Sequence, residues 1–180
     1  MSEKPSFFSR PGGRIITLAA IVFVLDQFTK QLVLRYLLEG DERTVIPGFF
    51  NLAHRVNTGA AWSLFTGNNA LLAAVALVAL VVLTLTRHHF KANTFTGQIA
   101  FGLIFGGIIG NLTDRILPGR HAVVDFLHFY LQRRGTLDTY DFPAFNVADS
   151  AICTGVALIF ILTWKQDHPQ SQPQKAAADQ

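Results

Sequence analysis

The chain has 180 residues, of which half are hydrophobic and only 15% are charged, and its formal net charge is +3. A soluble domain normally carries about 25% charged residues, so this composition excludes an ordinary soluble protein and indicates a membrane protein. The positive charge is scattered over loops and tails without a basic stripe, which excludes a nucleic-acid-binding protein.

Four apolar segments are long enough to cross a bilayer as helices. They lie at about residues 15–37, 70–86, 97–113 and 147–164. The predicted fold class is therefore an all-α membrane protein with four transmembrane helices. Residues 1–166 are expected to form a single integral-membrane domain, and residues 167–180, rich in Gln, Pro and Ala, a disordered cytoplasmic tail.

The first predicted helix follows three basic residues and contains two charged ones. Its opening apolar stretch resembles a secretory signal, but no small-residue cleavage pattern follows, so we expect an uncleaved helix. The basic residues favour a cytoplasmic N-terminus; they are Lys4, Arg10 and Arg14. Asp26 and Lys30 lie four residues apart and therefore on one helix face.

Residues 39–57 connect the first two helices and are expected on the outer membrane surface. A Pro47-Gly48 turn lies between two apolar pairs, which predicts a hairpin and hence a small β-rich cradle. Asn57 and the small residues after it are typical of backbone that approaches a ligand closely. Arg87 and Lys91, after the second helix, fit a cytoplasmic loop.

The third predicted helix combines a packing face with a polar end. Gly102, Gly106 and Gly110 repeat every four residues, a spacing that lets membrane helices pack closely. Three polar residues then share one face at its end; they are Asn111, Asp114 and Arg115.

Residues 115–145 form the second outer segment and lead into the fourth helix. Asp125 lies within this segment, and Asn146 and Asp149 open the helix on one face. Cys153 is expected to pack there as a small residue. The segment holds four arginines on the side where the positive-inside rule disfavours them, which suggests local roles; they are Arg115, Arg120, Arg133 and Arg134.

With a cytoplasmic N-terminus, all of these polar groups fall at the outer ends of the helices. Each has a simpler explanation by itself: Asp26 and Lys30 neutralise one another, Asp114 ends a helix, Asp125 is a loop charge and Asp149 caps a helix. Those explanations do not predict that all of these groups lie on one side of the membrane. A shared functional site does predict it. Charged groups at membrane depth are also functional candidates by themselves.

Two carboxylates in one site can share a proton, so that one activates water while the other protonates a carbonyl oxygen. Asp125 and Asp149 are the predicted pair, and no metal or other cofactor is needed. The sequence lacks the H-E-x-x-H and G-x-S-x-G motifs of zinc and serine hydrolases. A dyad of Lys30 with Ser150 or Ser63, a small proton-coupled transporter and a structural scaffold stay open as alternatives.

The motifs together resemble the bacterial lipoprotein signal peptidases, the signal peptidase II family. They are D-Q-F-T-K at 26–30, V-I-P-G-F-F-N-L at 45–52, N-T-G-A-A-W-S at 57–63, G-N-L-T-D-R at 110–115, V-V-D-F at 123–126 and F-N-V-A-D-S at 145–150. The resemblance implies an aspartic endopeptidase of the bacterial inner membrane that removes signal peptides from prolipoproteins. Cleavage would occur before a cysteine carrying diacylglycerol.

The same resemblance implies residue roles and partners. Asp125 and Asp149 match the catalytic dyad. Asn57, Asn111, Arg115 and Asn146 match residues that line the site, and Asp26, Lys30 and Asp114 match supporting positions. The family pattern also implies a periplasmic helix between Phe126 and Pro143, contact with membrane lipids, inhibition by globomycin-type antibiotics, both termini in the cytoplasm and a site facing the periplasm. We expect a monomer. Arg133 and Arg134 are hypothesised to affect substrate entry or lipid headgroup contact.

Overall fold

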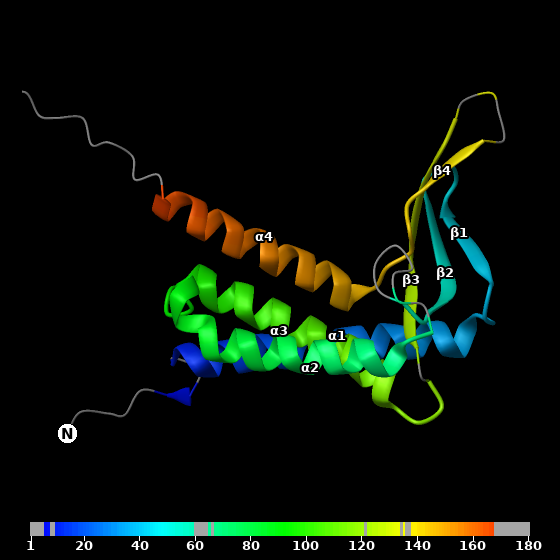
Figure 1. The fold of residues 1–180 in the computed structure, drawn as a ribbon. Helices are drawn as coiled ribbons and strands as arrows, with labels where there is room; N and C mark the ends of the chain where they lie inside the picture. The colour runs from blue at the N-terminus through cyan, green and yellow to red at the C-terminus, as the bar shows by residue number, and fades with distance from the viewer. Residues whose placement is uncertain are drawn as a thin grey trace, which may run out of the picture.

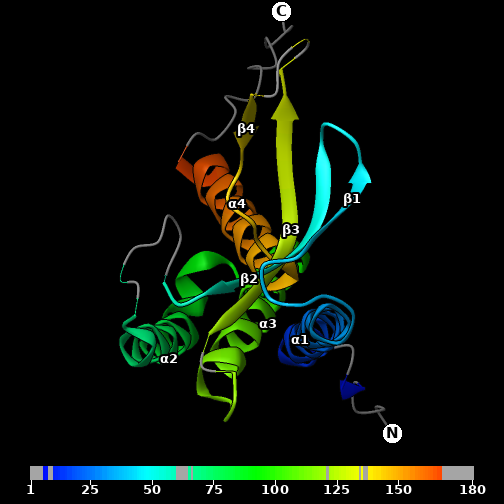
Figure 2. The ribbon, with the colours of Figure 1, turned by 90° about the vertical axis from the view of Figure 1, so that its right-hand side faces the viewer.

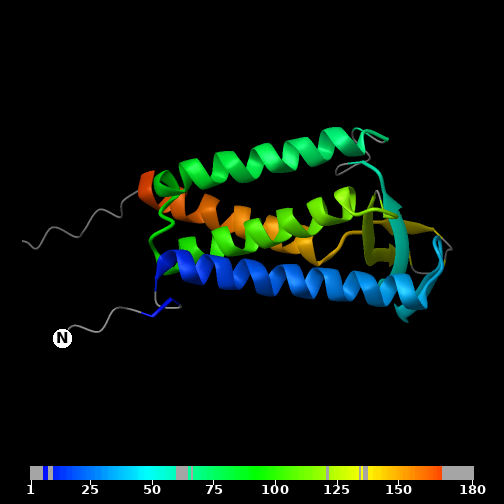
Figure 3. The same ribbon diagram turned by 90° about the horizontal axis from the view of Figure 1, so that it is seen from below.

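The computed structural model describes residues 6–7, 10–59, 65, 67–120, 122–133, 135 and 138–167. Four helices dominate it, and all four are long and apolar enough to cross a membrane, as the sequence predicts. They are α1 (Pro11–Tyr36), α2 (Asn69–Thr86), α3 (Phe95–Ile116) and α4 (Val147–Asp167), with a short 3-10 turn, η3 (Arg87–Phe90), after α2. The start of α1 and the end of α4 lie at the same end of the bundle (Figures 1 and 3).

Helix α3 is the most buried of the four, and its glycines permit this. A Cβ added to Gly106 would lie 2.7 Å from the carbonyl oxygen of Ala19 in α1, and one added to Gly107 would lie 2.4 Å from that of Ala148 in α4. Neither contact tolerates a side chain, so the backbones approach closely on both sides of α3. The predicted glycine face is confirmed and packs α3 against α1, while the neighbouring Gly107 packs it against the residues that open α4.

A four-stranded antiparallel sheet lies at the other end of the bundle (Figure 2). Its strands follow chain order: β1 (Glu42–Ile46), β2 (Phe50–Asn57), β3 (Val123–Gln132) and β4 (Thr139–Asp141). The hairpin predicted around Pro47-Gly48 joins β1 to β2, and Gly48 supplies the positive φ of 76° that the turn requires.

The strands correct two expectations from the sequence. The all-α description is incomplete, and the helix expected between Phe126 and Pro143 is wrong: the described residues of that stretch form β3 and β4. The segment V-V-D-F-L-H-F-Y-L-Q is rich in β-branched and aromatic residues, which favour strands when a neighbouring strand is available. Strand β2 provides that neighbour from Phe50↔Phe129 to Asn57↔Val123.

A small apolar core holds the sheet on the bundle. Val33 and Leu37 of α1 pack with Val124 and Phe126 of β3. The buried His54 side chain of β2 adds a contact through Nδ1, 3.0 Å from the Leu37 carbonyl oxygen. The sheet is therefore anchored to the end of α1. Asp167, the first residue of the predicted tail 167–180, ends α4, and the rest of that tail lies outside the described residues. So do three side chains considered in the sequence: Lys4, Ser63 and Arg134.

Candidate active site

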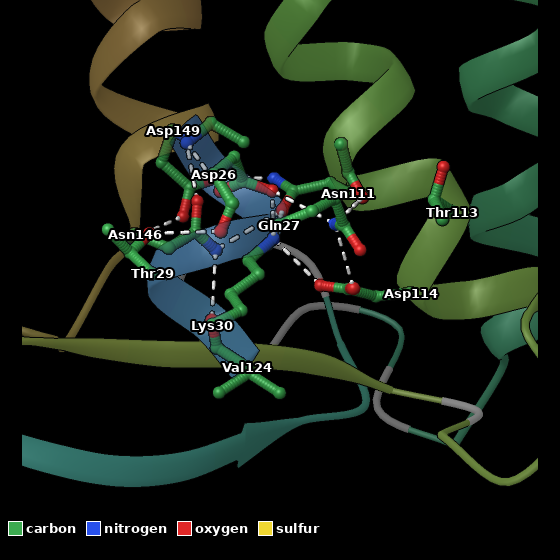
Figure 4. Close-up of polar contacts among 12 residues, drawn as sticks. Asp26, Gln27, Thr29, Lys30, Asn111, Thr113, Asp114, Val124, Asn146 and Asp149 are labelled. Carbon is green, nitrogen blue, oxygen red and sulfur yellow. Dashed lines mark hydrogen bonds and ion pairs between the residues drawn. The ribbon is translucent and has the colours of Figure 1, made fainter. Parts of the chain in front are cut away.

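A fully buried lysine lies at the centre of a charge network between α1 and α3 (Figure 4). The Lys30 Nζ lies 2.8 Å from Asp26 Oδ2 and 2.7 Å from Asp114 Oδ2. It also donates to Asn111 Oδ1 at 2.9 Å. An ammonium group has three donors, and each has a partner here. The predicted Asp26–Lys30 pair forms, but it is one part of a larger network.

A second cation completes this network. Arg120, in the loop after α3, pairs with Asp114 and donates to Gln27 Oε1 at 3.0 Å. Gln27 Nε2 in turn donates to Asp114 Oδ1 at 3.1 Å. Two buried carboxylates are thus balanced by two cations, which reduces the cost of burial. Sequence reasoning missed Gln27 altogether and noted Arg120 only as one of the arginines on the unexpected side.

Asp26 connects the network to the start of α4. Its Oδ1 accepts a hydrogen bond of 2.9 Å from the backbone N–H of Ala148. At the same helix start, Asn146 Oδ1 accepts from the N–H of Asp149 (2.9 Å), and Asp149 Oδ2 accepts from the N–H of Asn146 (3.2 Å). This reciprocal arrangement is a capping box. The capping role considered for Asp149 is real, and it uses only one of the two carboxylate oxygens.

The remaining polar contacts bring Asp125 and Asp149 into one site. Asn146 Nδ2 donates to Asp125 Oδ1 at 2.7 Å, and Asn111 Nδ2 donates to Asp149 Oδ1 at 2.7 Å. Asn57, at the end of β2, donates to the other oxygen of Asp125 at 2.9 Å. Asn146 therefore contacts both carboxylates, one through its side chain and one through its backbone.

A β-bulge directs Asp125 into this site. The backbone N–H groups of Phe126 and Leu127 both donate to the Phe145 carbonyl oxygen, at 3.0 and 2.8 Å. Successive N–H groups of a regular strand point to opposite sides, so this pattern marks an extra residue in β3. Phe126 and Leu127 consequently both pack on the core, while Asp125 and His128 both line the cavity.

The cavity has a volume of about 1160 Å³ and lies between the sheet and the ends of α3 and α4 next to it. Its lining includes both aspartates, three of the predicted polar residues (Asn57, Asn111 and Arg115) and several apolar side chains, among them Val56, Phe142 and Ile152. Arg115 is held by the carbonyl oxygens of Asn111 and Gly59, at 3.3 and 3.0 Å. Cys153 is exposed and lines the cavity, so the expectation that it packs in the helix is wrong.

Burial raises the pKa of the Asp125 carboxyl to about 7, and the charge of nearby Asp149 contributes in the same direction. Hydrogen bonds from Asn57 and Asn146 oppose the rise because they stabilise the ionised form. A carboxyl with a raised pKa of this kind can still hold a proton at neutral pH, unlike an ordinary aspartic acid. The pair can therefore supply one acid and one base in the same cavity.

The geometry weighs against other chemistries. Among the residues described, no group of three or more His, Cys, Asp or Glu side chains is placed to hold a metal ion. The Ser150 hydroxyl donates to the Asn146 carbonyl oxygen at 3.0 Å, and the donors of Lys30 are directed to three other residues. A dyad of Ser150 with Lys30 does not form.

A family model for signal peptidase (SPase) II matches residues 18–165. The chain belongs to the signal peptidase II family. The lipoprotein signal peptidase of Anoxybacillus flavithermus is 38% identical over 150 residues, covering 83% of this chain and 84% of that protein. The one from Geobacter metallireducens is 37% identical over 167 residues, covering 91% of this chain and 98% of that protein.

Solved structures agree with the family assignment. A bacterial membrane enzyme determined by the in meso method at 2.3 Å resolution superposes with a TM-score of 0.73 at 34% identity, over 90% of this chain and 94% of that one. A second such structure, at 1.9 Å resolution, gives a TM-score of 0.68 at 36% identity. This signal peptidase II relative is thus a bacterial membrane protein of a peptidase family, and the matches give no support to a transporter.

Proposed function

We propose that this protein is an aspartic lipoprotein signal peptidase, with Asp125 and Asp149 as its catalytic pair. It removes signal peptides from prolipoproteins by cleaving before a diacylglyceryl-modified cysteine. The name shared by its relatives supports the substrate class. One observation carries the catalytic assignment: a buried and a half-buried carboxylate, bridged by Asn146, share a cavity, and the pKa of the buried one, Asp125, is raised to about 7.

In the proposed mechanism, one aspartate is ionised and the other protonated. The ionised carboxylate takes a proton from a water molecule as the water oxygen attacks the scissile carbonyl carbon. The protonated carboxyl donates its proton to the carbonyl oxygen, which gives a neutral tetrahedral intermediate. When the C–N bond breaks, the carboxyl that gained the water proton delivers it to the leaving amine of the modified cysteine, and the other carboxylate takes back a proton from a hydroxyl of the intermediate as the new carboxyl group forms. The raised pKa of Asp125 supports a pair that keeps one proton at neutral pH.

The supporting residues have distinct parts in this scheme. Asn57, Asn111 and Asn146 hold the two carboxylates by direct hydrogen bonds. Arg115 presents positive charge to the cavity, where it would stabilise charge that develops on the substrate. The buried residues Asp26, Lys30 and Asp114 fix Asn111 and the start of α4, and so act through other groups.

The placement in the membrane is part of the proposal. Residues 1–166 would form one domain in the inner membrane with both termini cytoplasmic, and residues 39–57 and 115–145 on the periplasmic side. The shared position of the two helix ends away from the sheet supports this orientation (Figure 1). The apolar side chains of the cavity suit lipid chains of the substrate, and a globomycin-type inhibitor would occupy the same space. The protein would act as a monomer.

Cleavage of a purified diacylglyceryl-modified prolipoprotein tests the assignment. Asp125→Asn and Asp149→Asn should each lower the rate by about 10²- to 10⁴-fold, the contribution of one acid or base group. Asp41→Asn is the matched control, because Asp41 is exposed, does not line the cavity and accepts a hydrogen bond from the backbone N–H of Leu38. Cleavage by either dyad variant near the wild-type rate would defeat the proposal.

A further inference from the structure

The outer end of the cavity carries charged residues that the proposed reaction does not use. Arg55 of β2, His128 of β3 and Asp141 of β4 line the same cavity as the two aspartates. The bulge in β3 places His128 on the cavity side together with Asp125. Three residues of strand separate the two by about 10 Å along β3. The charged end therefore lies farther from the helices than the dyad does (Figure 2).

His128 lies between two carboxylates on different strands. Its Nδ1 is 3.3 Å from Glu42 Oε1 of β1, and its Nε2 is 3.3 Å from Asp141 Oδ1 of β4. A neutral imidazole has one N–H and can donate to only one of them. Of the two oxygens, Glu42 Oε1 also pairs with Arg55, whereas Asp141 Oδ1 has the imidazole as its partner.

Glu42 and Asp141 differ in the partners that balance their negative charge. Glu42 pairs with Arg55 and accepts a hydrogen bond of 3.0 Å from Asn51 Nδ2. Asp141 receives its hydrogen bond from Thr139 Oγ1, at 2.7 Å, on the oxygen that faces away from the imidazole contact. The charges of Glu42 and Arg55 cancel. Among the described residues, no lysine or arginine pairs with Asp141, whose side chain is 52% exposed, so its charge is the one that a substrate cation can reach.

The two ends of the cavity fit the two halves of the proposed substrate. One end is formed by Ile152 and Cys153 of α4, inside a helix long and apolar enough to cross the membrane. An apolar signal peptide belongs at that end because it shares the hydrocarbon environment. The polar segment after the cleaved bond must leave the membrane, and the sheet end of the cavity lies on its way out.

We propose that Asp141, with His128 beside it, is a subsite for a basic side chain in the substrate segment that follows the modified cysteine. A lysine or arginine there supplies a positive charge that pairs with the Asp141 carboxylate, and an acidic side chain is repelled. This inference rests on the proposed function and adds a substrate preference to it.

Three diacylglyceryl-modified prolipopeptides test the subsite. They are identical except for Lys, Gln or Glu at both the second and third positions after the modified cysteine. With the wild type, the Lys peptide should have a kcat/KM about threefold or more above that of the Glu peptide, as expected for one partly exposed ion pair. The difference should lie mainly in KM, because the subsite is distant from the bond that breaks.

Variants of Asp141 test whether this residue causes the preference for the Lys peptide over the Glu peptide. Asp141→Asn should reduce the Lys-to-Glu ratio to about one, and Asp141→Lys should invert it. Both should cleave the Gln peptide near the wild-type rate, which demonstrates that they fold. Glu39→Gln removes an exposed acid that does not line the cavity and should leave the ratio as in the wild type.

Two results would overturn the subsite while leaving the proposed function intact. One is a wild type that cleaves all three peptides with equal kcat/KM. The other is a Lys preference that persists unchanged in Asp141→Asn. A wild type that cleaves none of the three peptides would instead overturn the proposed function, and the subsite with it.

Discussion

The alkaline limit of activity is expected to depend on the amide of Asn57. Its Nδ2 donates to Asp125 Oδ2 at 2.9 Å, and this hydrogen bond holds the pKa of Asp125 below the value that burial and Asp149 would otherwise produce. In Asn57→Ala the ionised form loses that support, so the pKa of Asp125 rises. Because the pair must keep one proton to act as the acid, activity should then persist to higher pH.

The size of the expected pH shift follows from the strength of the hydrogen bond that Asn57→Ala removes. A hydrogen bond to a charged group contributes about 1.5–3 kcal/mol, and one pH unit corresponds to about 1.4 kcal/mol. Water that enters the vacated space will replace part of the lost bond, so we expect the lower end of this range. The wild-type activity should fall as pH rises through about 7, the pKa of Asp125. The midpoint of Asn57→Ala should lie about one pH unit higher.

The assay is kcat/KM for cleavage of one prolipopeptide between pH 5 and about 10. Asn146→Ala should move the midpoint in the same direction, because Asn146 Nδ2 donates to the other oxygen of Asp125. Asn51→Ala is the control, since this buried amide bonds Glu42 instead of the dyad. A midpoint that stays in place or moves to lower pH in both dyad variants would refute the reasoning.

Three further outcomes follow from the packing around the site. Lys30→Met leaves two buried carboxylates without their shared cation and should destabilise the detergent-solubilised protein by about 3–5 kcal/mol; an unchanged thermal midpoint would contradict this. Gly107→Ala places a Cβ 2.4 Å from a carbonyl oxygen at the start of α4, so both stability, by about 1–3 kcal/mol, and cleavage should fall. Gly12→Ala, with open space around it, should change neither. A bulky maleimide on Cys153 should block cleavage because this residue lines the cavity, whereas Cys153→Ser should resist the reagent; equal inhibition of both proteins would argue against a blocked cavity.

Local patterns in the sequence predict much of this architecture. Long, mostly apolar segments predict the four helices, because a helix satisfies its own backbone hydrogen bonds within the bilayer. The four-residue spacing of glycines predicts the close packing of α3, and the Pro47-Gly48 turn predicts the β1–β2 hairpin. Each of these signals depends on residues that are neighbours in the chain.

Strand β3 and the role of Arg120 were not predicted, because both depend on residues that are distant in the chain. Strand β3 forms because β2, which contains Asn57 opposite Val123, is there to pair with it. A strand requires such a neighbour, and strand propensity varies with that context. Arg120 likewise differs from other loop arginines only through Asp114 and Gln27, which the fold brings within hydrogen-bonding distance.

The sequence by itself determined the membrane class, the family and the side chains available at the outer ends of the helices. The tertiary structure decided which oxygen each donor reaches: Asn146 bridges the two aspartates, and the bulge in β3 places Asp125 and His128 on the cavity side. The reason is the short range of these interactions. A hydrogen bond requires heavy atoms within about 3 Å, and that distance depends on how helices and strands from separate parts of the chain pack together.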